Sequence, residues 1–142
     1  MVQIFTIGYG GRRLDDFIKL LMEYDVDILV DVRRFPRSKN QDFNGGNLGK
    51  ELSKHDINYV FMGEYLGGFR REGYEKHTET EGYERGINRL LDLASQGNVA
   101  IMCKERTSKG CHRRYIIRTL KDRGIEVIEI IRTKFPRDSK LT

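Results

Sequence analysis

The chain has 142 residues, a formal net charge of +5 and a sequence pI ≈ 9.3. This length is typical of one domain that buries about two-thirds of the surface of its unfolded chain. Hydrophobic residues make up 38% and charged residues 33%, with a mean hydropathy of −0.59, which indicates a globular protein with a heavily charged surface. No apolar run reaches the roughly 18 residues that a membrane span needs. The positive charge permits an anionic partner and is equally compatible with a solvated basic surface.

The beginning of the chain and its cysteine content indicate where the protein resides. The first residues, MVQIFTIGYG, lack the basic-then-apolar layout of a signal peptide. Two cysteines in a chain of this size suggest thiols in a reducing compartment rather than a disulfide scaffold. We therefore expect a cytoplasmic protein with no membrane partner. The sequence leaves the oligomeric state open.

Short apolar runs alternate with segments of helical periodicity along the whole chain. Strands are expected at 2–7, 27–32, 57–61, 98–103 and 125–131. Helices are expected at 14–22, 47–55, 81–96 and 111–123. The pattern predicts an α/β fold, a single three-layer domain over residues 1–131 with a five-stranded, largely parallel sheet. A basic C-terminal tail at 132–142 follows it.

The polarity of the five runs predicts their order in the sheet. The first, second and fourth runs are the most apolar, as central parallel strands are. The third contains Asn58 and Tyr59, and the fifth contains Glu126 and Glu129, which suits edge strands. The expected order is therefore 3-2-1-4-5, so that Gly8 and Cys103 flank one crevice at the carboxyl edge, where ligands of such sheets bind.

The densest cluster of reactive side chains follows the fourth strand. Cys103 ends that strand, Glu105 lies in the polar loop after it, and Cys111 and His112 open the next helix. Cations near the first turn of a helix lower the pKa of a thiol. We expect Cys103 or Cys111 to be a nucleophile or redox thiol, with Glu105 and His112 as the acid–base groups.

Cations and glycines at the same strand ends predict an anion-binding site. Helical phase places Arg113 on the buried face with Ile116 and Leu120, and a buried guanidinium needs an anion. That anion is either Asp31 or Glu105 of the chain, or the phosphate, sulfate or carboxylate of a ligand. The expected binding residues are Gly8, Tyr9, Arg33, Gly67, Gly68 and Arg113.

Other interpretations of these residues remain open. Residues 62–80 have no periodicity and predict a functional lid. Zinc would be held by Cys103, Cys111 and His112, with His77 as the fourth ligand. A Cys103–Cys111 disulfide would make the site redox-switched. The layout of strand, cysteine, loop and helix is also that of cysteine phosphatases and rhodaneses, although Lys109 stands where they carry arginine.

The order of these motifs resembles a prokaryotic family known as domain of unknown function 488. The resemblance covers the chain up to Ile131 and implies no particular activity. It depends on Thr6-Ile7-Gly8-Tyr9 with Arg12, Asp31-Val32-Arg33 with Pro36, Ser38 and Phe43, Tyr59, Leu66-Gly67-Gly68, Met102-Cys103 with Glu105, and Cys111-His112-Arg113. Ser38, one of these matching residues, joins the expected anion-binding set.

Two functions of different class follow from the sequence. The first is an enzyme acting on a phosphate-, nucleotide- or carboxylate-containing substrate with a cysteine/arginine site at the carboxyl edge of the sheet. The second is a nucleic-acid-binding protein, in which basic loops follow the phosphates and aromatic side chains stack on bases. The aromatic candidates are Phe35, Phe43, Tyr65, Phe69 and Tyr74. The sequence identifies no cofactor.

Overall fold

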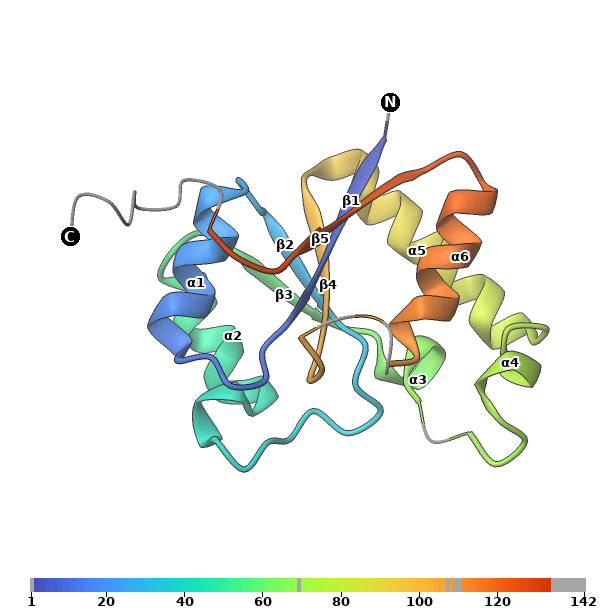
Figure 1. The fold of residues 1–142 in the computed structure, drawn as a ribbon, viewed down its shortest axis with the longest axis horizontal. Helices are drawn as coiled ribbons and strands as arrows, with labels where there is room; N and C mark the ends of the chain where they lie inside the picture. Colours follow the sequence, from blue (N-terminus) through green and yellow to red (C-terminus); the bar gives the residue numbers. More distant parts are fainter. Residues whose placement is uncertain (1, 69, 107, 109–110, 134–142) are drawn as a thin grey trace, which may run out of the picture.

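Five parallel strands form one sheet in the middle of the molecule, with helices on both of its faces (Figure 1). The computed structural model describes residues 2–68, 70–106, 108 and 111–133. The strands are β1 (Gln3–Gly8), β2 (Ile28–Asp31), β3 (Asn58–Phe61), β4 (Val99–Cys103) and β5 (Glu126–Ile130). The predicted α/β class and the parallel sheet are confirmed. Residues 134–142, most of the expected basic tail, lie outside the described residues.

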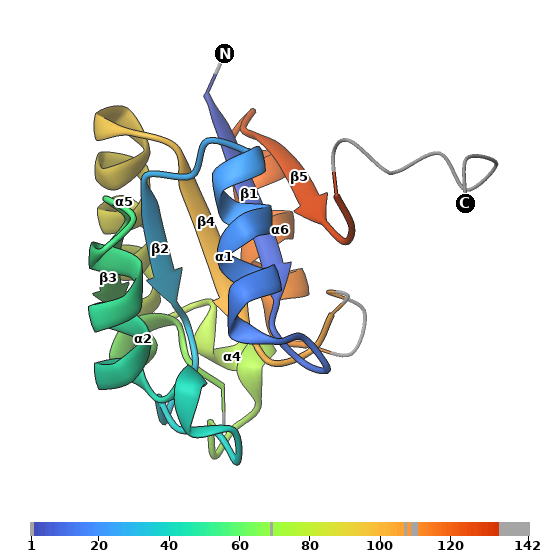
Figure 2. The same ribbon diagram turned by 90° about the vertical axis from the view of Figure 1, so that its left-hand side faces the viewer.

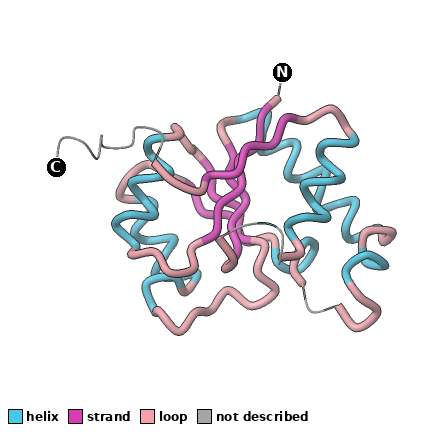
Figure 3. Tube along the Cα trace, viewed as in Figure 1, coloured by secondary structure: helices cyan, strands magenta, loops and turns pink. Residues whose placement is uncertain are grey.

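The helices lie where the periodicity predicts them, with additional short turns in the loops (Figure 3). Thr80 caps α5 by accepting a hydrogen bond from the amide of Tyr83 at 3.1 Å, and Gly97 follows its last residue. Two one-turn helices, α3 (Gly63–Leu66) and α4 (Tyr74–His77), lie within the segment 62–80, whose sequence has no periodicity. The helical elements are α1 (Leu14–Glu23), η1 (Gln41–Phe43), α2 (Gly45–Ser53), α3 (Gly63–Leu66), α4 (Tyr74–His77), α5 (Glu81–Gln96) and α6 (Arg113–Asp122).

The sheet order is β3-β2-β4-β1-β5, so the expected order 3-2-1-4-5 is wrong in one respect: β1 and β4 exchange places. All five residues of β4 are buried, and the strand lies at the centre of the sheet. β1 begins with the exposed Gln3, which donates a hydrogen bond to Glu126 of the edge strand β5. The third and fifth strands are the edges, as predicted. Because β1 and β4 remain neighbours, Gly8 and Cys103 lie side by side at the carboxyl edge, as predicted, and they are in register.

Each face of the sheet has its own apolar core. Helices α1 and α2 cover one face and α5 and α6 the other, as the turned view shows (Figure 2). The first core includes Phe17 and Leu48, and the second includes Ile87 and Ile116. In the part of the chain that is described, no helix has the length and apolar character that crossing a membrane requires. This three-layer arrangement leaves the carboxyl edge of the sheet to the loops.

Candidate functional site at the carboxyl edge of the sheet

Backbone hydrogen bonds between the segments of β1 and β4 continue past the ends of the two strands. Gly8 is in register with Cys103, and the amide of Tyr9 donates a hydrogen bond to the Cys103 carbonyl at 3.1 Å. The amide of Gly10 donates to the Lys104 carbonyl at 2.7 Å. The glycine turn after β1 therefore fixes the start of the loop that follows β4, which positions the first cysteine.

A cavity of about 540 Å³ opens over these strand ends. It gathers most of the residues that the sequence analysis selected, from four separate segments of the chain. The predicted site residues that line it are Tyr9, Arg33, Gly68, Cys103, Glu105, Cys111 and His112. The remaining lining residues are Arg34, Phe35, Arg37, Arg70, Tyr74 and Lys104.

The lining of this cavity is strongly cationic. Of the described residues that line it, five are arginine or lysine and one, Glu105, is a carboxylate. Arg70 donates hydrogen bonds to the carbonyl oxygens of Gly67 at 2.9 Å and Glu64 at 2.6 Å, and neither acceptor neutralises its charge. Burial, together with the neighbouring charge of Arg34, lowers the pKa of Arg70. The cavity is thus suited to an anion.

Arg33 is the cation whose charge the protein already balances. Asp31, which is 0% exposed, accepts hydrogen bonds from Arg33 Nε at 2.9 Å and Nη2 at 2.7 Å. The Tyr59 hydroxyl donates to the same carboxylate. Burial opposes the charge of Arg33, but the bonds and charge of Asp31 outweigh it and raise the pKa of the guanidinium. Burial, followed by the charge of Asp31, raises the pKa of Tyr59, which keeps its hydroxyl a donor.

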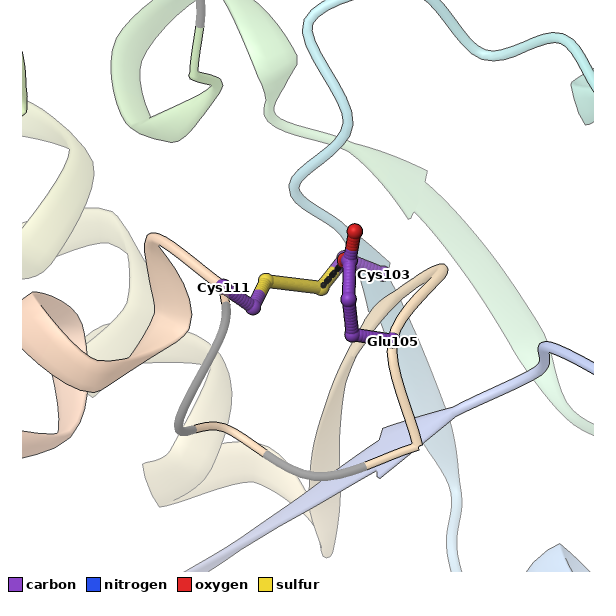
Figure 4. A group of neighbouring side chains, drawn as sticks. All are labelled: Cys103, Glu105 and Cys111. Atoms are coloured by element: carbon purple, nitrogen blue, oxygen red, sulfur yellow. Dashed lines mark hydrogen bonds between the residues drawn. A yellow bond between two sulfur atoms is a disulfide. The ribbon is translucent and has the colours of Figure 1, made fainter.

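The two cysteines meet at the floor of the cavity. The structure joins Cys103 to Cys111 by a disulfide, the alternative that the sequence left open (Figure 4). Their Cα atoms lie 7.8 Å apart. The carboxylate of Glu105 approaches the same pair, with its Oε2 atom 3.6 Å from Cys103 Sγ. Both cysteines are buried and the Glu105 side chain is exposed, so the carboxylate lies on the open side of the cluster.

His112 extends this cluster and is held in a fixed orientation. Its Nε2 atom lies 2.9 Å from the Val32 carbonyl oxygen, which can only accept, so Nε2 carries the proton in the neutral ring. The other nitrogen, Nδ1, therefore directs a lone pair toward Cys111 Sγ, 3.8 Å away. Burial is the largest cause that lowers the pKa of His112, which favours this neutral form.

Arg113 is buried, as its helical phase predicts, but its partners differ from those expected. Its guanidinium donates hydrogen bonds to the Thr6 hydroxyl and to the backbone carbonyl of Glu105. Asp31 pairs with Arg33 instead. Burial lowers the pKa of Arg113 to about 10, and its Nε atom has no hydrogen-bond partner among the described residues. Arg113 therefore ties the loop that carries Glu105 to the start of α6.

Several expected binding residues lie outside the cavity lining. Gly8, the last residue of β1, lies against the backbone of Glu105, and Arg113 donates to the carbonyl of the same residue. Gly67 packs against Arg34 and Gly63. Ser38 lies in a separate depression, where its amide donates to Asn44 at 2.7 Å. For these four, a role in binding stays a prediction.

Residues from the alternative interpretations are also dispersed. His77 lies against the Tyr65 carbonyl at 2.6 Å. Among the described residues, the group of possible ligand atoms around the cysteines consists of Cys103, Glu105 and Cys111, so it contains neither His77 nor His112, although His112 Nδ1 is 3.8 Å from Cys111 Sγ. Phe43 is fully buried and stacks on Tyr9, so it offers no surface to a base. Phe69 lies outside the described residues.

The additional cations of the cavity have a signal in the sequence. Arg34 and Arg37 lie in the loop after β2, and Arg70 lies in the loop after α3. All three belong to basic clusters that follow strands or short helices in the sequence. Sequence patterns alone do not show that these separate loops converge on the cysteines, because the path of a loop has no periodicity. Tyr74 is brought in by its ring contact with His112, at a centroid distance of 5.0 Å.

Fold and site together define a parallel α/β domain with a cationic, cysteine-containing cavity at the carboxyl edge of its sheet. Residues 13–120 match the family model described as "Domain of unknown function DUF488", and the chain belongs to this family. The resemblance seen in the sequence is thereby confirmed. Neither the curated proteins nor the solved structures gave a match.

Proposed function

We propose that the chain is an enzyme that binds a phosphate-, nucleotide- or carboxylate-containing substrate in the cavity and acts on it with the Cys103–Cys111 cluster. The supporting observation is the uncompensated positive charge above the two cysteines. Among the described residues, Arg34, Arg37, Arg70 and Lys104 form no ion pair with a carboxylate. Guanidinium groups bind phosphate and carboxylate oxygens through paired hydrogen bonds, and a partly enclosed site strengthens them.

The remaining walls of the cavity suit the non-ionic part of such a substrate. Phe35 at the rim and Tyr74 in the wall present aromatic surface. The volume of about 540 Å³ falls within the range of about 300–1,000 Å³ for small-molecule sites. A compound that joins an aromatic ring to a phosphate, such as a mononucleotide, uses both the cationic and the aromatic parts of the lining.

The reacting groups of this proposal are those nearest the cavity floor. Once the disulfide is reduced, Cys103 and Cys111 supply thiols for nucleophilic or redox chemistry. His112 Nδ1 lies next to Cys111 Sγ, and Glu105 lies next to Cys103 Sγ, so each thiol has a neighbouring group that can take up its proton.

The nucleic-acid hypothesis has less support from the distribution of charge. Outside the cavity, a neighbouring depression is lined by Arg71 and Lys76, but Glu72 and Glu79 line it as well. A continuous basic path along the surface would be needed to follow a phosphate backbone. The cations instead concentrate where a small anion fits.

We expect adenosine monophosphate and phenyl phosphate to bind to the cavity, whereas adenosine and phenol, which lack the oxyanion, do not. Arg70→Ala and Arg37→Ala should each weaken binding about tenfold, because each removes one guanidinium, a loss of roughly 1.4 kcal/mol. Isothermal titration calorimetry on the reduced full chain, treated with a chelator and measured at low salt, provides the test. Arg89→Ala, an exposed change on α5, is the matched control and should leave affinity unchanged.

Equal affinity for adenosine and its monophosphate would contradict the proposal, as would wild-type affinity in both cavity variants. Tight binding of a single-stranded oligonucleotide, with an affinity that falls steeply with salt, would favour the nucleic-acid function instead.

A further inference from the structure

We propose that the reduced chain binds one Zn²⁺ ion at the floor of the cavity, through the side chains of Cys103, Glu105, Cys111 and His112. The metal and the thiol chemistry proposed above use the same four side chains, so the zinc-bound chain and the metal-free dithiol are alternative states. Binding of the metal does not require the enzymatic function, because the ligand atoms come from the chain alone. The arguments are the spacing of the ligand atoms, the span between the cysteines, the orientation of the histidine and the charge of the surroundings.

Three of the four proposed ligand side chains, those of Cys103, Glu105 and Cys111, have the spacing of a zinc coordination shell. One ligand atom from each of Cys103, Glu105 and Cys111 lies within 4.8 Å of the other two (Figure 4). With Zn–S distances of about 2.3 Å and Zn–N or Zn–O distances of about 2.0 Å, the edges of a tetrahedron that include a sulfur atom are roughly 3.5–3.8 Å long. Within this group, the distance from Cys103 Sγ to Glu105 Oε2 is 3.6 Å. His112 lies outside the group of three and joins the set through its Nδ1 atom, 3.8 Å from Cys111 Sγ.

The backbone span between the two cysteines also accommodates an ion. Their Cα atoms are 7.8 Å apart, whereas disulfides usually span about 4.4–6.8 Å. Two thiolates that share a zinc ion hold their sulfur atoms roughly 3.8 Å apart, which suits a longer Cα–Cα span. The strand end and the helix start thus lie at a separation that a bridging metal can fill.

The protein holds His112 and Cys111 as it would hold ligands. A ligating histidine ordinarily donates its second ring N–H to a carbonyl or carboxylate, and His112 Nε2 is placed to donate to the Val32 carbonyl. The amide of Arg113 donates to Cys111 Sγ at 3.5 Å, which stabilises a thiolate. Cys111 and His112 are adjacent in sequence at the start of α6, and the 3.8 Å between Cys111 Sγ and His112 Nδ1 shows that their side chains nevertheless converge.

The charge of the surroundings suits such a complex. Two thiolates and one carboxylate with Zn²⁺ leave a net charge of −1, and the cations of the cavity lie around it. Glu105 is the exposed member of the ligand set. A substrate oxygen that displaces Glu105 would bind the metal directly from the cavity, and this last step alone rests on the proposed function.

Metal binding requires the dithiol form. A phosphine reductant cleaves the disulfide by taking up an oxygen atom from water, and the two sulfur atoms receive two electrons and two protons. Binding of Zn²⁺ then releases both thiol protons, because the thiolates are the ligands. In the reverse direction, hydrogen peroxide oxidises the two thiolates to the disulfide and the ion is released.

The test uses the full chain, reduced with a phosphine, incubated with zinc sulfate and freed of excess metal by gel filtration. Elemental analysis should find one zinc ion per chain, and none after oxidation to the disulfide. Cobalt(II) in place of zinc should give thiolate-to-metal charge transfer in the near ultraviolet and the intense visible bands of a tetrahedral site. Cys103→Ser and Cys111→Ser should abolish both signals, whereas His77→Gln should retain them.

A second measurement keeps the test decisive if a cysteine variant fails to fold. Zinc should protect both thiols of the reduced wild-type chain from alkylation by iodoacetamide, as mass spectrometry of the labelled chain would show. Reduced wild-type chain without stoichiometric zinc, or with zinc that leaves both thiols reactive, would overturn the proposal. The zinc experiment contains no phosphate compound, and the anion titration is done without metal. Failure of the zinc proposal can therefore be distinguished from failure of the proposed anion-binding enzyme.

Discussion

Asp31→Asn is expected to lower the free energy of unfolding by about 3–5 kcal/mol, because it leaves a buried guanidinium without its counter-ion. Asp31 is 0% exposed and Arg33 only 7%. The carboxylate accepts hydrogen bonds from Arg33 Nε and Nη2, from the Arg33 amide at 3.0 Å and from the Tyr59 hydroxyl. An amide carries no charge, and one of its two polar atoms is a donor that would face these donors.

Urea denaturation of wild type and variant, followed by circular dichroism, measures this difference. Glu51→Gln is the matched control, since it also removes a carboxylate from an ion pair, here with Lys54 at 2.8 Å on the surface of α2. Exposed ion pairs of this kind contribute little to the free energy of unfolding, so the urea midpoint of the control should lie close to that of the wild type. A midpoint for Asp31→Asn as high as that of the control would show that Arg33 does not depend on this carboxylate.

The fold shows which features of a sequence carry enough information for prediction. Strands and long helices were predictable because apolar periodicity reports burial, and both edges of the sheet were predictable from their polar residues. The polarity of the strands did not predict which of β1 and β4 lies at the centre of the sheet, because each is a nearly continuous apolar run in the sequence. What distinguishes them is Gln3 at the start of β1 and its bond to Glu126, a contact between strands far apart in the sequence.

The site shows the same limit at the level of single side chains. Helical phase correctly buries Arg113, because rotation about a helix axis depends only on sequence spacing. The Arg113 guanidinium donates to the backbone carbonyl of Glu105. Because every residue has a backbone carbonyl, no sequence pattern could identify this acceptor. The convergence of Arg37 and Arg70 on one cavity depends likewise on the paths of two loops. Proximity of the two cysteines was predictable because a strand, a short loop and a helix constrain it.

Gly8→Ala is expected to destabilise the protein by about 3 kcal/mol, the upper end of the usual cost of overpacking, because a methyl group at this position overlaps the chain itself. A Cβ atom on Gly8 would collide with the backbone carbonyl of Glu105 and lie 2.6 Å from the Arg106 Cα. Both are backbone atoms, so no side-chain rotation can relieve the overlap. The loop after β4 would have to move away from β1, breaking the bond from the Gly10 amide to the Lys104 carbonyl.

Gly46→Ala in α2 is the matched control and should have the opposite sign. No atom lies within 4 Å of a Cβ built at Gly46, and alanine in place of glycine within a helix stabilises by up to about 1 kcal/mol. Urea denaturation of both variants separates the two effects. Equal unfolding midpoints would mean that the β4 loop does not pack on β1. Because Arg113 holds the same Glu105 carbonyl, a displaced loop should also reduce phosphate binding in the Gly8 variant and leave it unchanged in the Gly46 variant.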